Sequence, residues 1–64
     1  MLLVNGERRE LAAATLGEAL QELDYAEATV ATALNGEFVP ARARGETPVN
    51  DGDRIEILAP RQGG

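Results

Sequence analysis

Two Asn-Gly dipeptides, each lying between short apolar segments, constrain the fold of this chain more than any other sequence feature. A two-residue type I′ turn needs positive φ at both central positions, and asparagine followed by glycine tolerates this conformation best. The sequence therefore predicts two β-hairpins. Their strands are expected at residues 2–4 and 7–11, around Asn5-Gly6, and at residues 29–34 and 37–39, around Asn35-Gly36.

One helix is predicted between the two hairpins. Thr15 followed by Glu18 matches a capping box, in which the threonine oxygen accepts from an amide of the first turn and Glu18 bonds back to the Thr15 amide. The apolar residues then recur at helical spacing and form one stripe, which we interpret as core. The stripe consists of Leu16, Ala19, Leu20 and Leu23, and the helix is expected to end at Asp24-Tyr25.

The last third of the chain predicts a loop, a turn and one more strand. Pro40 ends the preceding strand because it cannot donate to a ladder. Residues 41–49 have no clear period and are expected to form a surface loop with a turn of 3₁₀ helix. Residues 50–53, Asn-Asp-Gly-Asp, have the composition of a tight turn. The strand at residues 54–58 should turn its two isoleucines inward.

This order of elements predicts an α+β fold of the β-grasp, ubiquitin-like type. A helix between two hairpins serves as the crossover and must lie across one face of a mixed sheet of about five strands. The last strand then lies in the middle, beside the first. We expect a β-grasp domain at residues 1–60 and a tail at residues 61–64. The predicted core is Leu2, Val4, Leu11, Leu16, Leu20, Leu23, Leu34, Val39, Ile55 and Ile57.

Composition excludes most catalytic roles for this chain. Its 64 residues suffice for one small domain, and they include no cysteine, histidine or lysine. The usual nucleophiles, the neutral-pH base and the commonest metal ligands are therefore missing, so we expect neither an enzyme nor a metal site. The net charge of −5 disfavours nucleic acid and anionic membranes and favours a partner with a basic surface. The apolar start is too short for a signal sequence or a membrane span, and a cytoplasmic location is expected.

The four last residues, Arg61-Gln62-Gly63-Gly64, contribute nothing to a core and suggest a tail that enters a partner. Four extended residues reach roughly 13 Å at about 3.3 Å each. A glycine pair fits a tunnel too narrow for a β-carbon and presents the Gly64 carboxylate at its end. The alternative is a frayed terminus without function.

A docking surface is predicted on the sheet face opposite the helix. Leu3, Phe38 and Leu58 occupy outward positions of their strands and would form a small apolar patch. Glu56 lies beside this patch and would attract a partner with a basic surface. The alternative is that these are scattered surface residues, which are common.

Three segments in order resemble the ThiS family, the sulfur carriers of thiamin biosynthesis. They are Leu34-Asn35-Gly36-Glu37-Phe38-Val39-Pro40, Asp51-Gly52-Asp53-Arg54-Ile55-Glu56-Ile57 and the terminal Gly63-Gly64. One departure is visible, because many members carry an arginine and then an aromatic residue shortly after the Val-Pro. Here Ala41-Arg42-Ala43-Arg44 follows instead, without an aromatic residue.

The resemblance implies a chemistry at Gly64. An adenylating enzyme similar to ThiF would use ATP to convert the carboxylate into an acyl-adenylate, and a persulfide donor would then supply sulfur to give a thiocarboxylate. A thiazole synthase similar to ThiG would receive that sulfur. Three other interpretations remain open: a carrier like the small subunit of molybdopterin synthase, a ubiquitin-like modifier joined to lysines, and a plain interaction module.

Overall fold

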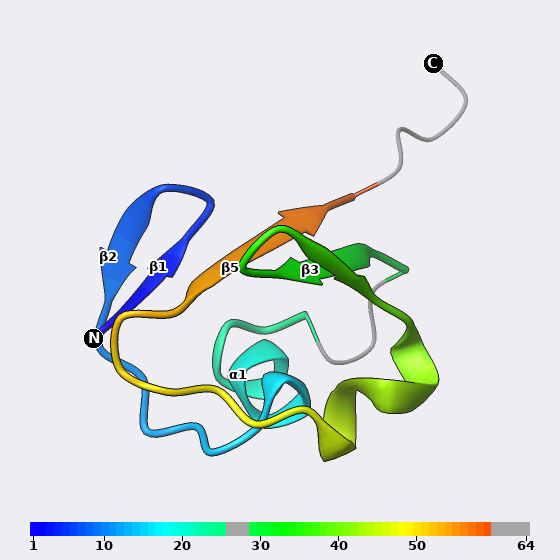
Figure 1. Ribbon diagram of the computed structural model, residues 1–64, viewed down its shortest axis with the longest axis horizontal. Helices are drawn as coiled ribbons and strands as arrows, with labels where there is room; N and C mark the ends of the chain where they lie inside the picture. Colours follow the sequence, from blue (N-terminus) through cyan, green and yellow to red (C-terminus); the bar gives the residue numbers. More distant parts are fainter. Residues whose placement is uncertain (26–28, 60–64) are drawn as a thin grey trace.

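The computed structural model describes residues 1–25 and 29–59, and in them five strands form one mixed sheet (Figure 1). The elements are β1 Leu2–Val4, β2 Glu7–Arg9, α1 Leu16–Glu22, β3 Ala31–Leu34, β4 Glu37–Val39, the 3₁₀ helix η1 Ala41–Glu46 and β5 Arg54–Leu58. The strand order is β2-β1-β5-β3-β4. Only β1 and β5 pair in parallel, and α1 lies across one face of the sheet (Figure 1). The predicted β-grasp architecture is confirmed, with the last strand in the centre.

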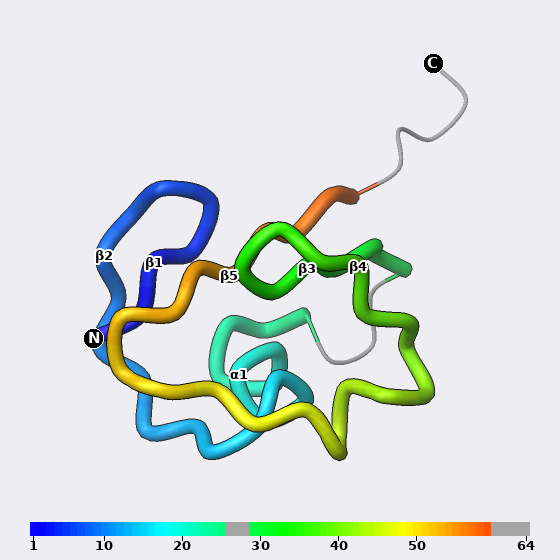
Figure 2. Tube along the Cα trace, viewed as in Figure 1, coloured from blue at the N-terminus to red at the C-terminus, as the bar shows by residue number. Residues whose placement is uncertain are grey.

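Both Asn-Gly pairs form the predicted turns. Asn5 and Gly6 have φ of 51° and 85°, and Asn35 and Gly36 have φ of 52° and 88°. These are the positive values that a type I′ turn requires at both central positions. The tube in Figure 2 shows each chain reversal between its two strands. Two strands are shorter than predicted, since β2 ends at Arg9 and β3 begins at Ala31.

The N-terminus of α1 is capped as predicted, with one correction. The Glu18 amide donates to Thr15 Oγ1 at 3.2 Å. The Glu18 carboxylate, however, accepts from the Ala14 amide at 2.8 Å rather than from the Thr15 amide. It therefore reaches one residue further back along the extended chain that precedes the helix. At the other end, Asp24 has φ of 72°, so the helix exit lies where the sequence predicted it.

The core lies between α1 and the sheet, and most of the predicted core residues are buried there. The buried apolar residues are Leu2, Val4, Leu16, Ala19, Leu20, Val39, Val49, Ile55 and Ile57. Three predicted members, Leu11, Leu23 and Leu34, are only partly buried and pack against the edge of this cluster. They lie where an element ends or has already ended, so solvent still reaches one side of each.

The segment after β4 contains the predicted turn of 3₁₀ helix, but its end is not the surface loop that the sequence predicted. It forms the six-residue helix η1 and then returns to the start of α1, where Val49 N donates to Ala14 O at 3.0 Å and Leu16 N donates to Thr47 O at 2.8 Å. These bonds bring Val49 into the core with 7% of its surface exposed. No periodic signal predicts this burial, because a single apolar residue between Pro48 and Asn50 forms no pattern.

Arg44 joins η1 to the sheet. Its Nε donates to Thr32 Oγ1 at 3.0 Å and its Nη2 donates to the carbonyl of Val30 at 2.6 Å. Thr32 is 2% exposed, and its hydroxyl in turn donates to the Val39 carbonyl at 2.8 Å. The only buried polar side chain of the described core is therefore satisfied on both sides. No helix in residues 1–25 and 29–59 is long and apolar enough to cross a membrane.

Candidate functional site

The central strand β5 is the element that leads into the C-terminal tail. It lies between β1 and β3, and it pairs with β3 along most of its length but with β1 only at its first two residues. The predicted tail residues Arg61, Gln62, Gly63 and Gly64 lie outside the described residues, and so does the proposed boundary between domain and tail. What the structure shows is the position of the strand that precedes them.

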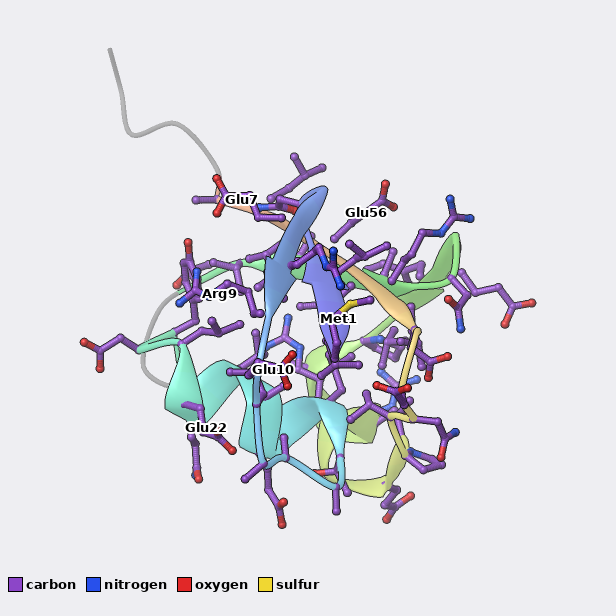
Figure 3. All side chains as sticks on the ribbon, turned by 90° about the vertical axis from the view of Figure 1, so that its left-hand side faces the viewer. Met1, Glu7, Arg9, Glu10, Glu22 and Glu56 are labelled. Atoms are coloured by element: carbon purple, nitrogen blue, oxygen red, sulfur yellow. The ribbon has the colours of Figure 1, made fainter. Side chains whose placement is uncertain are left out.

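The side chains of β5 alternate as predicted between the core and the outer sheet face. Ile55 and Ile57 are 0% and 6% exposed and pack beneath the sheet, whereas Glu56 and Leu58 face the other side. Figure 3 shows Glu56 on the side of the sheet opposite α1. Leu58 is 73% exposed. An apolar residue at the end of the central strand is therefore open to solvent.

An open groove of about 410 Å³ lies on this outer face. Its depth follows from the register, because Ala33 on β3 lies between Phe38 on β4 and Glu56 on β5, and Ala31 lies opposite Leu58. Two small side chains thus form the floor between larger ones. The groove is lined by Asn5, Gly6, Ala31, Thr32, Ala33, Phe38, Glu56 and Leu58.

The structure brings together three of the four predicted docking residues. Phe38, Glu56 and Leu58 all line the groove, and Phe38 is 70% exposed. Leu3 does not line it: it is half-buried on β1, opposite Arg54 and Arg8. The sequence analysis missed the floor of the groove. The alternation Ala31-Thr32-Ala33, two small residues on one face of a strand, was the signal that could have found it.

Among the groups of residues 1–25 and 29–59, the one with a shifted pKa lies at the far end of β5, away from the groove. The amino group of Met1 pairs with Asp51, in the turn that precedes β5. This hydrogen bond, together with the nearby carboxylate of Glu10, raises the pKa of the amine above its usual value. Within residues 1–25 and 29–59 no three acidic residues gather into a group that could hold a metal ion. The groove on the outer sheet face is therefore the candidate site of the described residues.

Comparisons with known proteins agree with this fold. The crystal structure of the thiamine biosynthesis protein ThiS from Geobacter metallireducens superposes with a TM-score of 0.80 at 37% identity, covering 98% of this chain and 97% of that one. The solution structure of a thiamine biosynthesis protein from the same organism gives a TM-score of 0.77 at 36% identity, covering 98% of this chain and 86% of that one.

Sequence relatives include both a free carrier and a larger enzyme. The sulfur carrier protein ThiS of Thermus thermophilus is 39% identical over 64 residues, the full length of both chains. A thiazole synthase of Paramagnetospirillum magneticum is 42% identical over 59 residues, which are 91% of this chain but only 18% of that protein. The model of the ThiS family matches residues 2–64, from the first strand to the terminal glycine, and this chain therefore belongs to the ThiS family.

Proposed function

We propose that this ThiS-family protein carries sulfur as a thiocarboxylate on Gly64 and delivers it for thiazole formation in thiamin biosynthesis. The observation that carries the proposal is the extent of the family match, which runs to residue 64 and so includes both terminal glycines. The full-length similarity to a sulfur carrier protein supports it. The position of β5 in the middle of the sheet provides a firm base for a tail that must enter a partner.

The chemistry starts from a carboxylate, which is a poor electrophile. An adenylating enzyme similar to ThiF would let the Gly64 carboxylate attack the α-phosphorus of ATP, so that pyrophosphate leaves and an acyl-adenylate forms. A persulfide sulfur then attacks the acyl carbon and AMP leaves. A thiol cleaves the resulting acyl disulfide and releases the thiocarboxylate. This sequence of steps needs no cofactor bound to the carrier.

All catalytic groups in this scheme belong to the partners. The chain has no cysteine, histidine or lysine, so no side chain of the carrier competes as a thiol or as an amine for the activated carbonyl. The protein therefore acts as a co-substrate that is consumed and regenerated, not as an enzyme. We place this cycle in the cytoplasm, where ATP is available.

The outer-face groove is the docking surface in this proposal. Phe38 and Leu58 would insert their exposed side chains into the adenylating enzyme, with Glu56 meeting a basic residue at the rim. Exposed aromatic and aliphatic residues around a depression are the usual anchors of protein interfaces. Leu3, on the same side of the sheet but outside the groove, would contact the partner at the margin. Thiazole synthase is the proposed acceptor, supported by the carrier-like segment within the Paramagnetospirillum protein.

The tail is tested by changing its length. Removing Gly64, or adding one alanine after it, should leave the thermal midpoint unchanged and abolish sulfur loading, because the carboxylate no longer meets the adenylation site. The measurement is mass spectrometry of the protein after incubation with the adenylating enzyme, ATP and a persulfide donor. Replacement of one oxygen by sulfur is expected in the unaltered protein alone. Equal loading of the extended protein would refute the mechanism, and an amide-linked conjugate would indicate a protein modifier instead.

The groove is tested by placing a charge in it. Leu58→Glu should weaken binding to the adenylating enzyme by at least tenfold, since burying an unpaired carboxylate at an interface costs several kcal/mol. Ala41→Glu adds the same charge at an exposed position of η1 and serves as the control. Calorimetric titration without ATP measures both affinities. Equal affinity of the two variants would show that the groove is not the docking surface.

A further inference from the structure

The C-terminal end of β5 extends beyond its neighbour β1. Strand β1 ends at Val4, which pairs with Ile55, whereas β5 continues to Leu58. A parallel neighbour would normally supply peptide groups to the NH and CO of Ile57. The chain cannot supply them here, because it has already turned away at Asn5, whose φ is 51°.

The side chain of Asn5 takes the place of the missing peptide groups. Its Oδ1 accepts from the Ile57 amide at 2.8 Å, and its Nδ2 donates to the Ile57 carbonyl at 3.2 Å. The backbone amide of Asn5 also donates to the carbonyl of Ile55 at 2.8 Å. A carboxamide has the same acceptor and donor as a peptide bond, so it continues the ladder by one more step.

On its other side, the end of β5 is held by backbone pairing. Thr32 lies opposite Ile57, and Ala31 lies opposite Leu58. Toward β1, however, the hydrogen bonds of Ile57 depend on the side chain of Asn5 alone. The side chain of Asn5 therefore determines whether the end of β5 is hydrogen-bonded on both sides or only on the side of β3.

We propose that Asn5 is a positioning residue for the chemistry at Gly64: it fixes the end of β5 so that the tail leaves the sheet from a constant point. This inference rests on the proposed function. The reason is entropic, because residues that fray from the end of β5 must be ordered again each time the tail enters a partner's active site. A fixed end of the strand leaves only the tail itself to be ordered.

Asn35 provides a matched control at the opposite end of the same strand. It occupies the same position of the second Asn-Gly turn, with φ of 52°. Its Oδ1 accepts from the Arg54 amide at 2.9 Å, and its Nδ2 donates to Asp53 Oδ1 at 3.2 Å. Both asparagines thus make two side-chain hydrogen bonds around β5, but only Asn5 does so beside the tail.

The experiment compares Asn5→Gly with Asn35→Gly. Glycine tolerates positive φ, so both variants keep their turns and lose two side-chain hydrogen bonds each. The Ile57 amide should exchange with deuterium faster in Asn5→Gly and not in Asn35→Gly. The rate of adenylation at saturating adenylating enzyme should fall about fivefold in Asn5→Gly, the equivalent of one lost hydrogen bond, and stay unchanged in Asn35→Gly. Asn5→Asp keeps the acceptor and loses the donor, so its adenylation rate should lie between the rates of the two glycine variants.

Asn5 also lines the groove, so affinity for the adenylating enzyme is measured separately without ATP. The proposal expects unchanged affinity together with a slower reaction of the bound complex. A loss confined to affinity, equal adenylation rates in the two glycine variants, or unchanged exchange of the Ile57 amide would overturn it. Failure of the unaltered protein to be adenylated would refute the proposed function, while the exchange measurement would still decide whether Asn5 holds the strand.

Discussion

Replacing Arg44 by alanine should destabilise the fold because this side chain is the polar link between η1 and the sheet. The substitution removes one hydrogen bond to the Thr32 hydroxyl and one to the Val30 carbonyl. Buried hydrogen bonds to charged groups contribute about 1.5–3 kcal/mol each. Because Arg44 is partly exposed, we take about 1 kcal/mol for each of its two bonds, or about 2 kcal/mol in total. A chain of this size has roughly 3–10 kcal/mol of stability, so the loss is a large share.

The assay is urea unfolding together with a thermal scan. A loss of about 2 kcal/mol corresponds to a decrease on the order of 10 °C in the midpoint for a domain this small. Arg42→Ala, at an exposed position of the same 3₁₀ helix, is the control and should change stability by less than about 0.5 kcal/mol. Combining Arg44→Ala with Thr32→Val should cost less than the sum of the two, because the residues share a bond. Equal stability of the Arg44 and Arg42 variants would refute the link.

Three further outcomes are expected. Leu20→Ala should cost about 2–5 kcal/mol in chemical unfolding, because Leu20 is 2% exposed beneath the sheet; an unchanged midpoint would contradict this packing. Thr15→Ala should cost about 1 kcal/mol through loss of the cap to Glu18, seen as reduced helicity and a lower midpoint. The pKa of the Met1 amine is raised in the fold, so its ion pair with Asp51 stabilises the protein below the unfolded pKa of 8.0. That contribution is lost as pH rises through the folded pKa, and Asp51→Asn should remove this pH dependence of unfolding.

Local sequence patterns predicted the elements well because each depends on short-range chemistry. The two Asn-Gly turns, the cap at Thr15 and the alternation of Ile55 and Ile57 were all confirmed. Errors occurred where a neighbour in space decides the outcome. The Glu18 carboxylate binds the Ala14 amide because of the path of the preceding chain, and Val49 is buried because its segment returns to α1.

For the candidate site, too, local patterns predicted one part and tertiary structure decided the other. Sequence alone indicated that Phe38, Glu56 and Leu58 face outward, since alternation along a strand assigns a face to each residue. It could not show that they surround one groove while Leu3 stays outside it, because that depends on the register of β3 between β4 and β5. The tail residues 61–64 lie outside the described structure, and their role remains a prediction.

The sequence by itself determined the two hairpins, the capped helix and the lack of cysteine, histidine and lysine, because these follow from turn conformation, helix periodicity and composition. Tertiary structure decided how the asparagines of the turns are used. The same dipeptide that reverses the chain also places a carboxamide against β5, and this contact exists only because β5, 52 residues later, pairs with β1. A hydrogen bond between distant segments leaves no local signal in the sequence. The turn alone already accounts for Asn5, and the alternation along β5 already accounts for Ile57.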